Sequence, residues 1–124
     1  MAACAELLTP LCALMVKRVM RSVVVHTDDN TVPVLDPALP RTRTGRFWVY
    51  VGDVRNPYVV YDYTPRRTRD GPERFLKGYR GYLQADAFSG YDRICAGPDV
   101  TEVACWAHVR RKFFECRTSA PVLA

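Results

Sequence analysis

The order of its predicted strands and helices constrains the fold of this chain more than any other feature of the sequence. Five segments have the composition of strands, at residues 22–27, 46–51, 58–63, 81–85 and 100–104. The first three follow one another without a helix, and the second and third are joined by a turn containing Gly52 and Pro57, which predicts a hairpin. The last two alternate with helices, as parallel crossover units do. We therefore expect an α/β fold with a mixed five-stranded sheet, antiparallel at one side and parallel at the other, flanked by helices.

The remaining segments supply the helices and the ends of the strands. Helices are predicted at residues 2–21, 70–79, 89–96 and 105–117. Asp70 is the expected N-cap of the second helix, because Glu73 follows it at capping-box spacing. The first strand is expected to end at residues 28–30, and residues 31–35 to continue as a short extended piece.

Positive charge is concentrated in the middle of the chain. The 124 residues carry 18 basic and 13 acidic side chains, and residues 41–80 carry ten basic and four acidic ones, a net of +6. Such a band suits a polyanion, most simply nucleic acid, and the alternative is a solvated face. The longest uncharged run, residues 7–16, is ten residues long. A membrane-spanning helix needs about 20 residues, so no membrane partner is expected. Five irregularly spaced cysteines favour free thiols in a reducing cytoplasm over a disulfide framework.

Two aspartates follow predicted strands directly. Asp28 comes after the run VVVHT, and Asp86 comes after GYLQA. In sheets with parallel strands, the carboxyl ends of the strands are where sites are built. Paired carboxylates hold hard divalent cations such as Mg²⁺, and two such ions assist phosphoryl transfer. The alternative is that each aspartate is a turn residue that ends its strand.

Four long strings resemble one protein family over most of the chain. They are HTDDNTVPVLD, TGRFWVYVGD, YVVYDYTPRRTRDGPERFLKGYRGYLQADAFSGYD and EVACWAHVRRKFFE. Together they are similar to the insertion-sequence-66 family of bacterial transposases. The resemblance implies a ribonuclease H-like fold and a catalytic Asp-Asp-Glu triad that cuts and joins DNA strands with Mg²⁺ or Mn²⁺. It also implies DNA as the partner and a cytoplasmic, nucleoid-associated location in a bacterium.

The resemblance assigns roles to particular residues. The family's His-x-Asp-Asp-Thr segment matches residues 26–30, which makes Asp28 the first catalytic carboxylate and Asp29 its polar neighbour; Asn replaces the final Thr here. The family's Gln-x-Asp-x-x-x-Gly-Tyr segment makes Asp86 the second. Both are also the implied metal ligands. The family's Glu is expected well downstream of the Cys-x-Ala-His segment, and Glu115 lies too close to that segment to match it.

The absence of that Glu leads us to expect a fragment of a transposase that is inactive alone. We expect residues 1–21 to be a helix preceding the core, residues 22–118 to be a partial ribonuclease H-like domain, incomplete at its C-terminus, and residues 119–124 to be a tail. The alternative function is a catalytically inactive remnant that binds DNA nonspecifically or associates with an intact transposase or with itself.

Other side chains have competing interpretations. Cys105 and His108 have the spacing of half a zinc site, but a structural cysteine with His108 near the acidic site is favoured. His26 is expected to be a core residue. Four aromatic residues of the predicted hairpin are expected to form core and cross-strand pairs: Trp48, Tyr50, Tyr61 and Tyr63. Eight basic residues are the candidate DNA contacts, with solvated faces as the alternative: Arg41, Arg43, Arg66, Arg67, Arg69, Arg110, Arg111 and Lys112.

Overall fold

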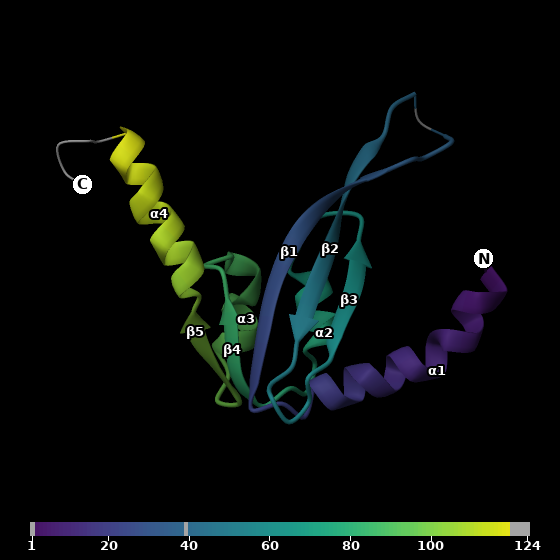
Figure 1. Ribbon diagram of the computed structural model, residues 1–124, viewed down its shortest axis with the longest axis horizontal. Helices are drawn as coiled ribbons and strands as arrows, with labels where there is room; N and C mark the ends of the chain where they lie inside the picture. The colour runs from purple at the N-terminus through teal and green to yellow at the C-terminus, as the bar shows by residue number, and fades with distance from the viewer. Residues whose placement is uncertain (1, 39, 120–124) are drawn as a thin grey trace.

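The computed structural model describes residues 2–38 and 40–119, and its centre is one five-stranded mixed sheet (Figure 1). The strands are β1 (Val24–Val34), β2 (Arg43–Val51), β3 (Val59–Thr64), β4 (Gly81–Ala85) and β5 (Val100–Ala104). Their spatial order is β3-β2-β1-β4-β5. β2 is antiparallel to β1 and β3, whereas β4 is parallel to β1 and β5. The predicted α/β fold with a mixed five-stranded sheet is therefore confirmed.

The helices follow the predicted order with shifted ends. They are α1 (Ala2–Val19), α2 (Asp70–Phe75), the 3-10 turn η1 (Ser89–Tyr91), α3 (Asp92–Cys95) and α4 (Trp106–Ser119). The prediction of Asp70 as N-cap is wrong by one residue, because Arg69 takes that position without a side-chain hydrogen bond. α2 is also shorter than predicted. The chain leaves the helix before Gly78, whose positive φ of 81° cannot continue it.

β1 is longer than predicted, with 11 residues (Val24–Val34) instead of the six of 22–27. Its residues from His26 to Val34 all pair with β2, so the polar residues 28–30 continue the strand instead of ending it. The neighbour on the other side, β4, stops at Ala85. The backbone hydrogen bonds to β2 thus hold residues 28–30 extended, while their second edge is open where β4 ends. The predicted strand end is wrong for the backbone of β1, but these residues do lie at the end of its pairing with β4.

One face of the sheet carries the hydrophobic core. Trp48 and Tyr50 of β2 are fully buried on this face, where α2, η1 and α3 cover the strands (Figure 1). The Trp48 Nε1–H donates to Thr64 Oγ1 at 2.7 Å, which satisfies the buried indole. The ring of Tyr50 stacks on Phe75 of α2 at a centroid distance of 3.7 Å. The hydrogen bond joins β2 to β3, and the stacked rings tie this hairpin to α2.

The opposite face is open in the described part of the chain. Tyr61 pairs with Val49 rather than with Trp48, so it points away from the core and is 69% exposed. The expected core position is therefore right for Trp48 and Tyr50, and Tyr63 forms the expected cross-strand pair, with Phe47 at a centroid distance of 5.9 Å. Tyr61 lies exposed on the open face, contrary to a core position. His26 also lies on the open face and is exposed, contrary to the prediction. The alternation of each strand, fixed by its register, decides these outcomes.

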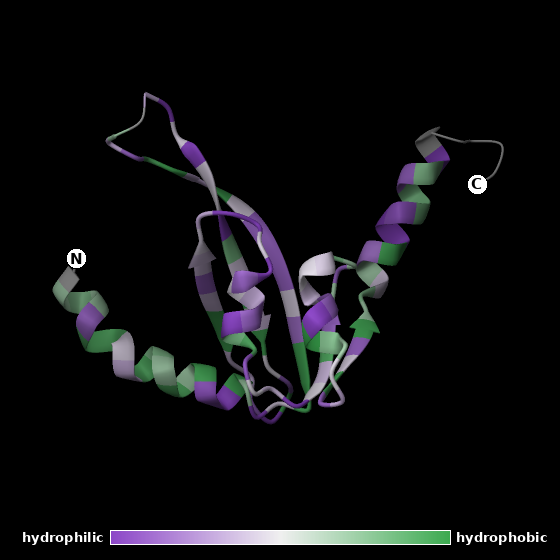
Figure 2. Ribbon diagram, turned by 180° about the vertical axis from the view of Figure 1, so that it is seen from behind, coloured by the Kyte–Doolittle hydropathy of each residue, from purple (hydrophilic) through white to green (hydrophobic). Residues whose placement is uncertain are grey.

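The two long helices extend away from the sheet on opposite sides (Figures 1 and 2). Both carry exposed apolar side chains: Leu7, Leu8, Leu11 and Leu14 on α1, and Trp106, Phe113 and Phe114 on α4. Green, hydrophobic stretches of ribbon run along α1 in Figure 2. None of the helices in residues 2–38 and 40–119 is long and apolar enough to cross a membrane.

Candidate metal and DNA site

A pocket of about 1020 Å³ lies beyond the carboxyl end of β4, between β1 and the start of α4. β4 is short and β1 is long, so the end of β4 leaves a recess beside β1. The chain then leaves β5 and turns into α4, whose first turns form the other wall. Carboxyl ends of parallel strands are the usual place for ligand sites in such sheets.

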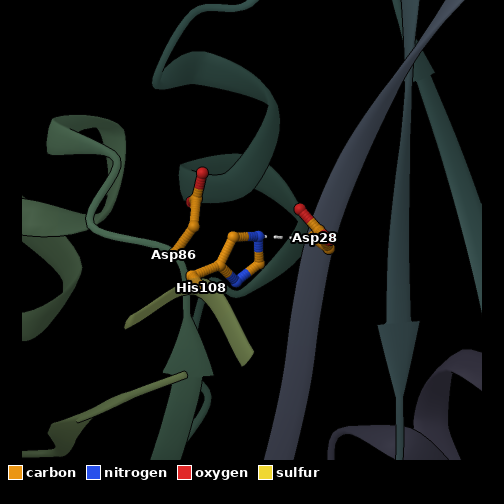
Figure 3. Close-up of side chains that lie close together, drawn as sticks. All are labelled: Asp28, Asp86 and His108. Carbon is orange, nitrogen blue, oxygen red and sulfur yellow. Dashed lines mark ion pairs between the residues drawn. The ribbon is translucent and has the colours of Figure 1, made fainter. Parts of the chain in front are cut away.

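Asp28 on β1 and Asp86, directly after β4, lie at the same level of two neighbouring parallel strands. The pairing of β1 with β4 joins His26 to Gln84, and each aspartate follows two residues later. His108 on the first turns of α4 completes the group. One oxygen or nitrogen atom of each of the three side chains lies within 4.8 Å of the others. Figure 3 shows the imidazole of His108 beside both carboxylates, with Nε2 3.8 Å from Asp28 Oδ2.

Asp29 points to the other face of the sheet and has a different environment. Its side chain is 1% exposed and pairs with Arg46 Nη1 at 2.7 Å and with Arg67 Nη2 at 2.8 Å. Asp28, by contrast, is 52% exposed, and one of its oxygens accepts a hydrogen bond from the Asp29 backbone N–H. Of the two adjacent carboxylates, only Asp28 is directed to the group with Asp86 and His108.

Arg67 links the two faces of the site. Its guanidinium donates to Asp29 Oδ1 and to Asp86 Oδ2 and lies 4.1 Å from the centre of the Phe88 ring. Partial burial lowers the pKa of Arg67, but its hydrogen bonds and charge attraction to Asp29 and Asp86 outweigh that effect, so the net pKa is raised. Arg67 is therefore always charged and neutralises part of the negative charge of the site.

Two polar atoms at the site are buried without a hydrogen bond among the described residues: Asp86 Oδ1 and His108 Nδ1. Arg67 occupies only Oδ2 of Asp86, which leaves Oδ1 without a partner. The Cys105 thiol lies near His108. Its pKa is lowered, chiefly by the nearby backbone N–H of His108 and then by the His108 side chain. Cys105 nevertheless lies outside the group formed by Asp28, Asp86 and His108.

The basic candidates are divided by the fold. Arg111 and Lys112 line the pocket, whereas Arg110 is exposed and is not part of its wall. Four others also lie outside the pocket wall and are exposed: Arg41, Arg43, Arg66 and Arg69. Glu115 lies 3.6 Å from Arg111 and 3.7 Å from Lys112, and it does not line the pocket either.

The sequence prediction missed several residues that build this pocket. Arg46 forms an ion pair with Asp29, and the Phe88 ring packs against the guanidinium of Arg67. Asn30 and Glu102 line the wall of the pocket. Asn30 lies two residues after Asp28 and therefore on the same face of β1. The sequence would have predicted this if the strand had been extended beyond residue 27. Arg46 is found only from the register of β1 against β2. No local pattern points to Phe88 or Glu102.

The side chains fit a divalent cation with oxygen ligands. Asp28 and Asp86 offer carboxylate oxygens at one place, and the unpartnered Oδ1 of Asp86 is available as a ligand. Within residues 2–38 and 40–119, the group contains no third carboxylate.

One comparison with known proteins identifies the family of this chain. A family model described as "Transposase IS66 family" matches residues 1–124. Two similar proteins of Sinorhizobium fredii, both called uncharacterized, are y4hP, 35% identical over 118 residues, and y4qI, 31% identical over 116 residues. These matches cover 87% and 83% of this chain but only 21% and 22% of the relatives. The chain thus spans about a fifth of the length of the curated relatives it matches. No solved structure matches it significantly.

Proposed function

The chain belongs to the IS66 family of transposases, and on that basis we propose that it forms part of the catalytic domain of an enzyme that cuts and joins DNA strands. The observation that carries this proposal is the placement of Asp28 and Asp86 side by side in a pocket whose wall includes Arg111 and Lys112. Carboxylates for a metal and cations for phosphate are the two requirements of metal-assisted phosphoryl transfer. The proposed location is the bacterial cytoplasm, with the nucleoid.

We propose a ribonuclease H-like fold for this domain. Its support is the strand order β3-β2-β1-β4-β5, in which β2 alone runs against the other four. The first carboxylate lies on the central strand and the second directly after β4. Both positions agree with those that the family resemblance implies for an Asp-Asp-Glu enzyme.

In the proposed reaction, the residues of this chain bind and orient the reactants. Asp28 and Asp86 would hold Mg²⁺ or Mn²⁺. When bound, divalent cations activate the attacking oxygen and stabilise the leaving oxygen of the phosphodiester. Arg67 fixes the orientation of Asp86 through Oδ2, so that Oδ1 faces away from the guanidinium contact. Arg111 and Lys112 would bind the phosphates that flank the reacting one.

A second candidate function is a remnant that binds DNA without catalysis. It is favoured by the absence of a third carboxylate from the group formed by the described residues. Two carboxylates collect a cation weakly, but positioning two ions needs a further ligand. On this reading the chain binds DNA nonspecifically, or it associates with an intact transposase.

Metal-dependent DNA binding tests the proposed site. We expect Mn²⁺ to strengthen binding of a fluorescently labelled duplex, measured by anisotropy against an EDTA control, because a held cation offers ligand positions to a phosphate. Asp28→Asn and Asp86→Asn should remove this increment. Their metal-free binding should tighten slightly, since each removes a negative charge. Asp92→Asn removes an equal charge at an exposed position outside the pocket and should keep the increment. An increment that survives in both pocket variants would overturn the proposed site.

Plasmid nicking separates the two candidate functions. We expect the 124-residue chain not to nick or join supercoiled DNA with Mg²⁺ or Mn²⁺, because the group formed by the described residues contains no third carboxylate. Metal-dependent strand transfer that Asp86→Ala abolishes would show a complete catalytic site, and Glu115→Gln would then test whether Glu115 supplies the missing ligand.

A further inference from the structure

His108 faces the two aspartates from a separate element of the fold. It lies on α4, where its backbone N–H donates to the Cys105 carbonyl at 3.0 Å and so begins the helix. This first turn brings the imidazole over the end of β4, between Asp28 of β1 and Asp86 (Figure 3). Three elements of the fold therefore converge on one point, each contributing one side chain.

The distances at this point suit a shared ion better than a direct contact. His108 Nε2 and Asp28 Oδ2 are 3.8 Å apart, which is too long for a hydrogen bond. With bonds of about 2.1 Å, adjacent ligands of an octahedral ion lie about 3 Å apart and opposite ligands about 4 Å apart. The three donor atoms, which lie within 4.8 Å of one another, reach these separations through small side-chain rotations.

The hydrogen bonding of Asp86 points to the same place. Arg67 binds Oδ2 and leaves Oδ1 buried with no partner among the described residues. A buried polar atom without a hydrogen-bond partner lowers the stability of the fold. A bound ion is one explanation for such an atom in a native structure. The two carboxylates alone offer only oxygen ligands, which is the donor set of Mg²⁺. The imidazole of His108 changes that set.

We infer that His108 is a third protein ligand of the ion held by Asp28 and Asp86, so that this site selects Mn²⁺ over Mg²⁺. The inference rests on the proposed function, which assigns the two carboxylates to a metal. Mg²⁺ prefers oxygen ligands and keeps its waters, whereas first-row transition ions accept imidazole nitrogen readily. Cys105 takes no part in the site, because it lies outside the group of three side chains. A zinc site built from Cys105 and His108 is therefore not what this geometry supports.

The chain offers a matched control for this inference. It contains two histidines, and His26 lies exposed on β1, two residues before Asp28, without belonging to the group. His26→Ala therefore removes the same side chain close to the site but no proposed ligand. Both variants are first compared with the wild type by circular dichroism and thermal unfolding, to establish that they are folded.

Calorimetric titration of the whole 124-residue chain with Mn²⁺ and with Mg²⁺ gives the first test. We expect the wild type to bind Mn²⁺ at least about tenfold more tightly than Mg²⁺. His108→Ala should lose about tenfold or more in Mn²⁺ affinity, in line with losses at other metal sites, and should keep its Mg²⁺ affinity within about twofold. His26→Ala should keep the wild-type ratio. An unchanged ratio in His108→Ala would overturn the inference.

Pulsed electron paramagnetic resonance gives the second test and needs no variant for its main result. Bound Mn²⁺ should show modulation from a directly coordinated imidazole nitrogen, which His26→Ala keeps and His108→Ala loses. Absence of this modulation in the wild type would also overturn the inference. Suppose that the wild type shows no nitrogen signal, but Asp28→Asn and Asp86→Asn each abolish the binding of Mn²⁺ and Mg²⁺. The inference about His108 then fails, and the proposed metal site stands. If both variants keep Mn²⁺ binding, the proposed site itself is wrong.

Discussion

Arg67 donates a hydrogen bond of 2.8 Å to one carboxylate oxygen of Asp86, and the other oxygen of Asp86 is buried with no hydrogen-bond partner in residues 2–38 and 40–119. The same guanidinium binds Asp29, the residue next to Asp28 on β1. A single side chain from the loop between β3 and α2 thus fixes Asp86 relative to the central strand. Arg67 itself lines the pocket, where it is hydrogen-bonded to both carboxylates.

Replacing Arg67 by Ala should destabilise the fold. It leaves Asp29, which is 1% exposed, with Arg46 as its remaining partner, and it frees the carboxylate of Asp86. Breaking a fully buried pair costs about 3–5 kcal/mol. Arg67 is 35% exposed and solvent screens part of its interaction, so we expect a loss of about 1–2 kcal/mol in the free energy of unfolding, measured by urea denaturation at pH 7.

Arg66→Ala is the matched control for Arg67→Ala. Arg66 is the preceding residue and is exposed, and its backbone carbonyl, which accepts a hydrogen bond from Thr64 Oγ1, remains in the variant. Its unfolding free energy should change by less than about 0.5 kcal/mol. Arg67→Lys should fall between the two variants, because a single ammonium cannot reproduce the planar fork of the guanidinium. Equal stability of the Arg66 and Arg67 variants would contradict the bridging role.

The sequence was sufficient for the elements whose ends are marked by local signals. Residues 81–85 and 100–104 were predicted as strands with the bounds that the structure gives. Both are short, and Asp86 and Cys105 directly after them leave the sheet. β1 was predicted too short, because aspartates in a strand read locally as a turn. Only its pairing with β2, set by residues about 20 positions away, keeps it extended.

The candidate site was predictable in part for the same reason. Asp28 and Asp86 follow segments whose strand character is visible, and the family resemblance pointed to the same two residues. The placement of Arg67 was not predictable, since a loop arginine in a basic band reads as a surface residue. Its ion pairs depend on the packing of the loop against Phe88 and on the register that directs Asp29 to the covered face. Local patterns carry neither kind of information.

Gly81→Ala should disturb the start of β4. Gly81 has a φ of 150°, in a region that residues with a side chain rarely adopt, and an added Cβ would lie 2.6 Å from the Val23 carbonyl oxygen. That carbonyl accepts the Tyr82 N–H, so the clash falls on the first contact between β1 and β4. Strained backbone alone costs about 1–3 kcal/mol, and with the clash we expect a loss of at least about 2 kcal/mol in urea denaturation.

Gly97→Ala serves as the control for this substitution. An added Cβ there would meet only the Ile94 carbonyl oxygen, at an ordinary contact distance of 3.9 Å. Its φ is not positive, so the substitution should be neutral or slightly stabilising. Similar losses for the two variants would show that the geometry at Gly81 is not what limits stability.

Asp53 should make the fold sensitive to acid. The Val23 backbone N–H donates to its carboxylate at 2.7 Å, and those of Arg55 and Asn56 donate at 3.0 Å. These bonds, that of Val23 first, lower the pKa of Asp53 below its ordinary value. Because the folded pKa is the lower one, the stabilisation is complete above the unfolded value of about 3.9 and is lost as the pH falls through the folded value.

Asp53→Asn should therefore flatten the fall of the melting temperature below about pH 4, at the cost of lower stability at pH 7. Thermal unfolding between pH 2 and pH 7, followed by circular dichroism, measures both effects. Asp92→Asn, at an exposed carboxylate, tests whether any loss of one negative charge has the same effect. If the melting temperature of Asp53→Asn falls as steeply below about pH 4 as that of the wild type, this role of Asp53 is contradicted.

The two pocket cations, Arg111 and Lys112, should contribute more to DNA binding than the other basic residues of α4. Arg111 and Lys112 line the pocket, and their neighbour Glu115 lies 3.6–3.7 Å away in exposed ion pairs, which are weak enough for DNA phosphates to replace. If both side chains neutralise phosphates, their joint replacement by Ala should lower the slope of log affinity against log salt by roughly 1.8 for duplex DNA. Fluorescence anisotropy of a labelled duplex at several salt concentrations measures this slope.

The matched control is the double variant Arg110→Ala with Arg117→Ala. It removes the same charge from the same helix at exposed positions outside the pocket wall, and alanine supports the helix in both cases. Long-range attraction falls equally in the two double variants, so only direct phosphate contacts distinguish them. If the two double variants lower the salt slope equally, DNA binds α4 as a general basic surface and not through Arg111 and Lys112 in particular. Binding should also be insensitive to the duplex sequence, because phosphate contacts carry no sequence information. Tight binding to one particular sequence would contradict the assignment of this pocket to phosphate contacts alone.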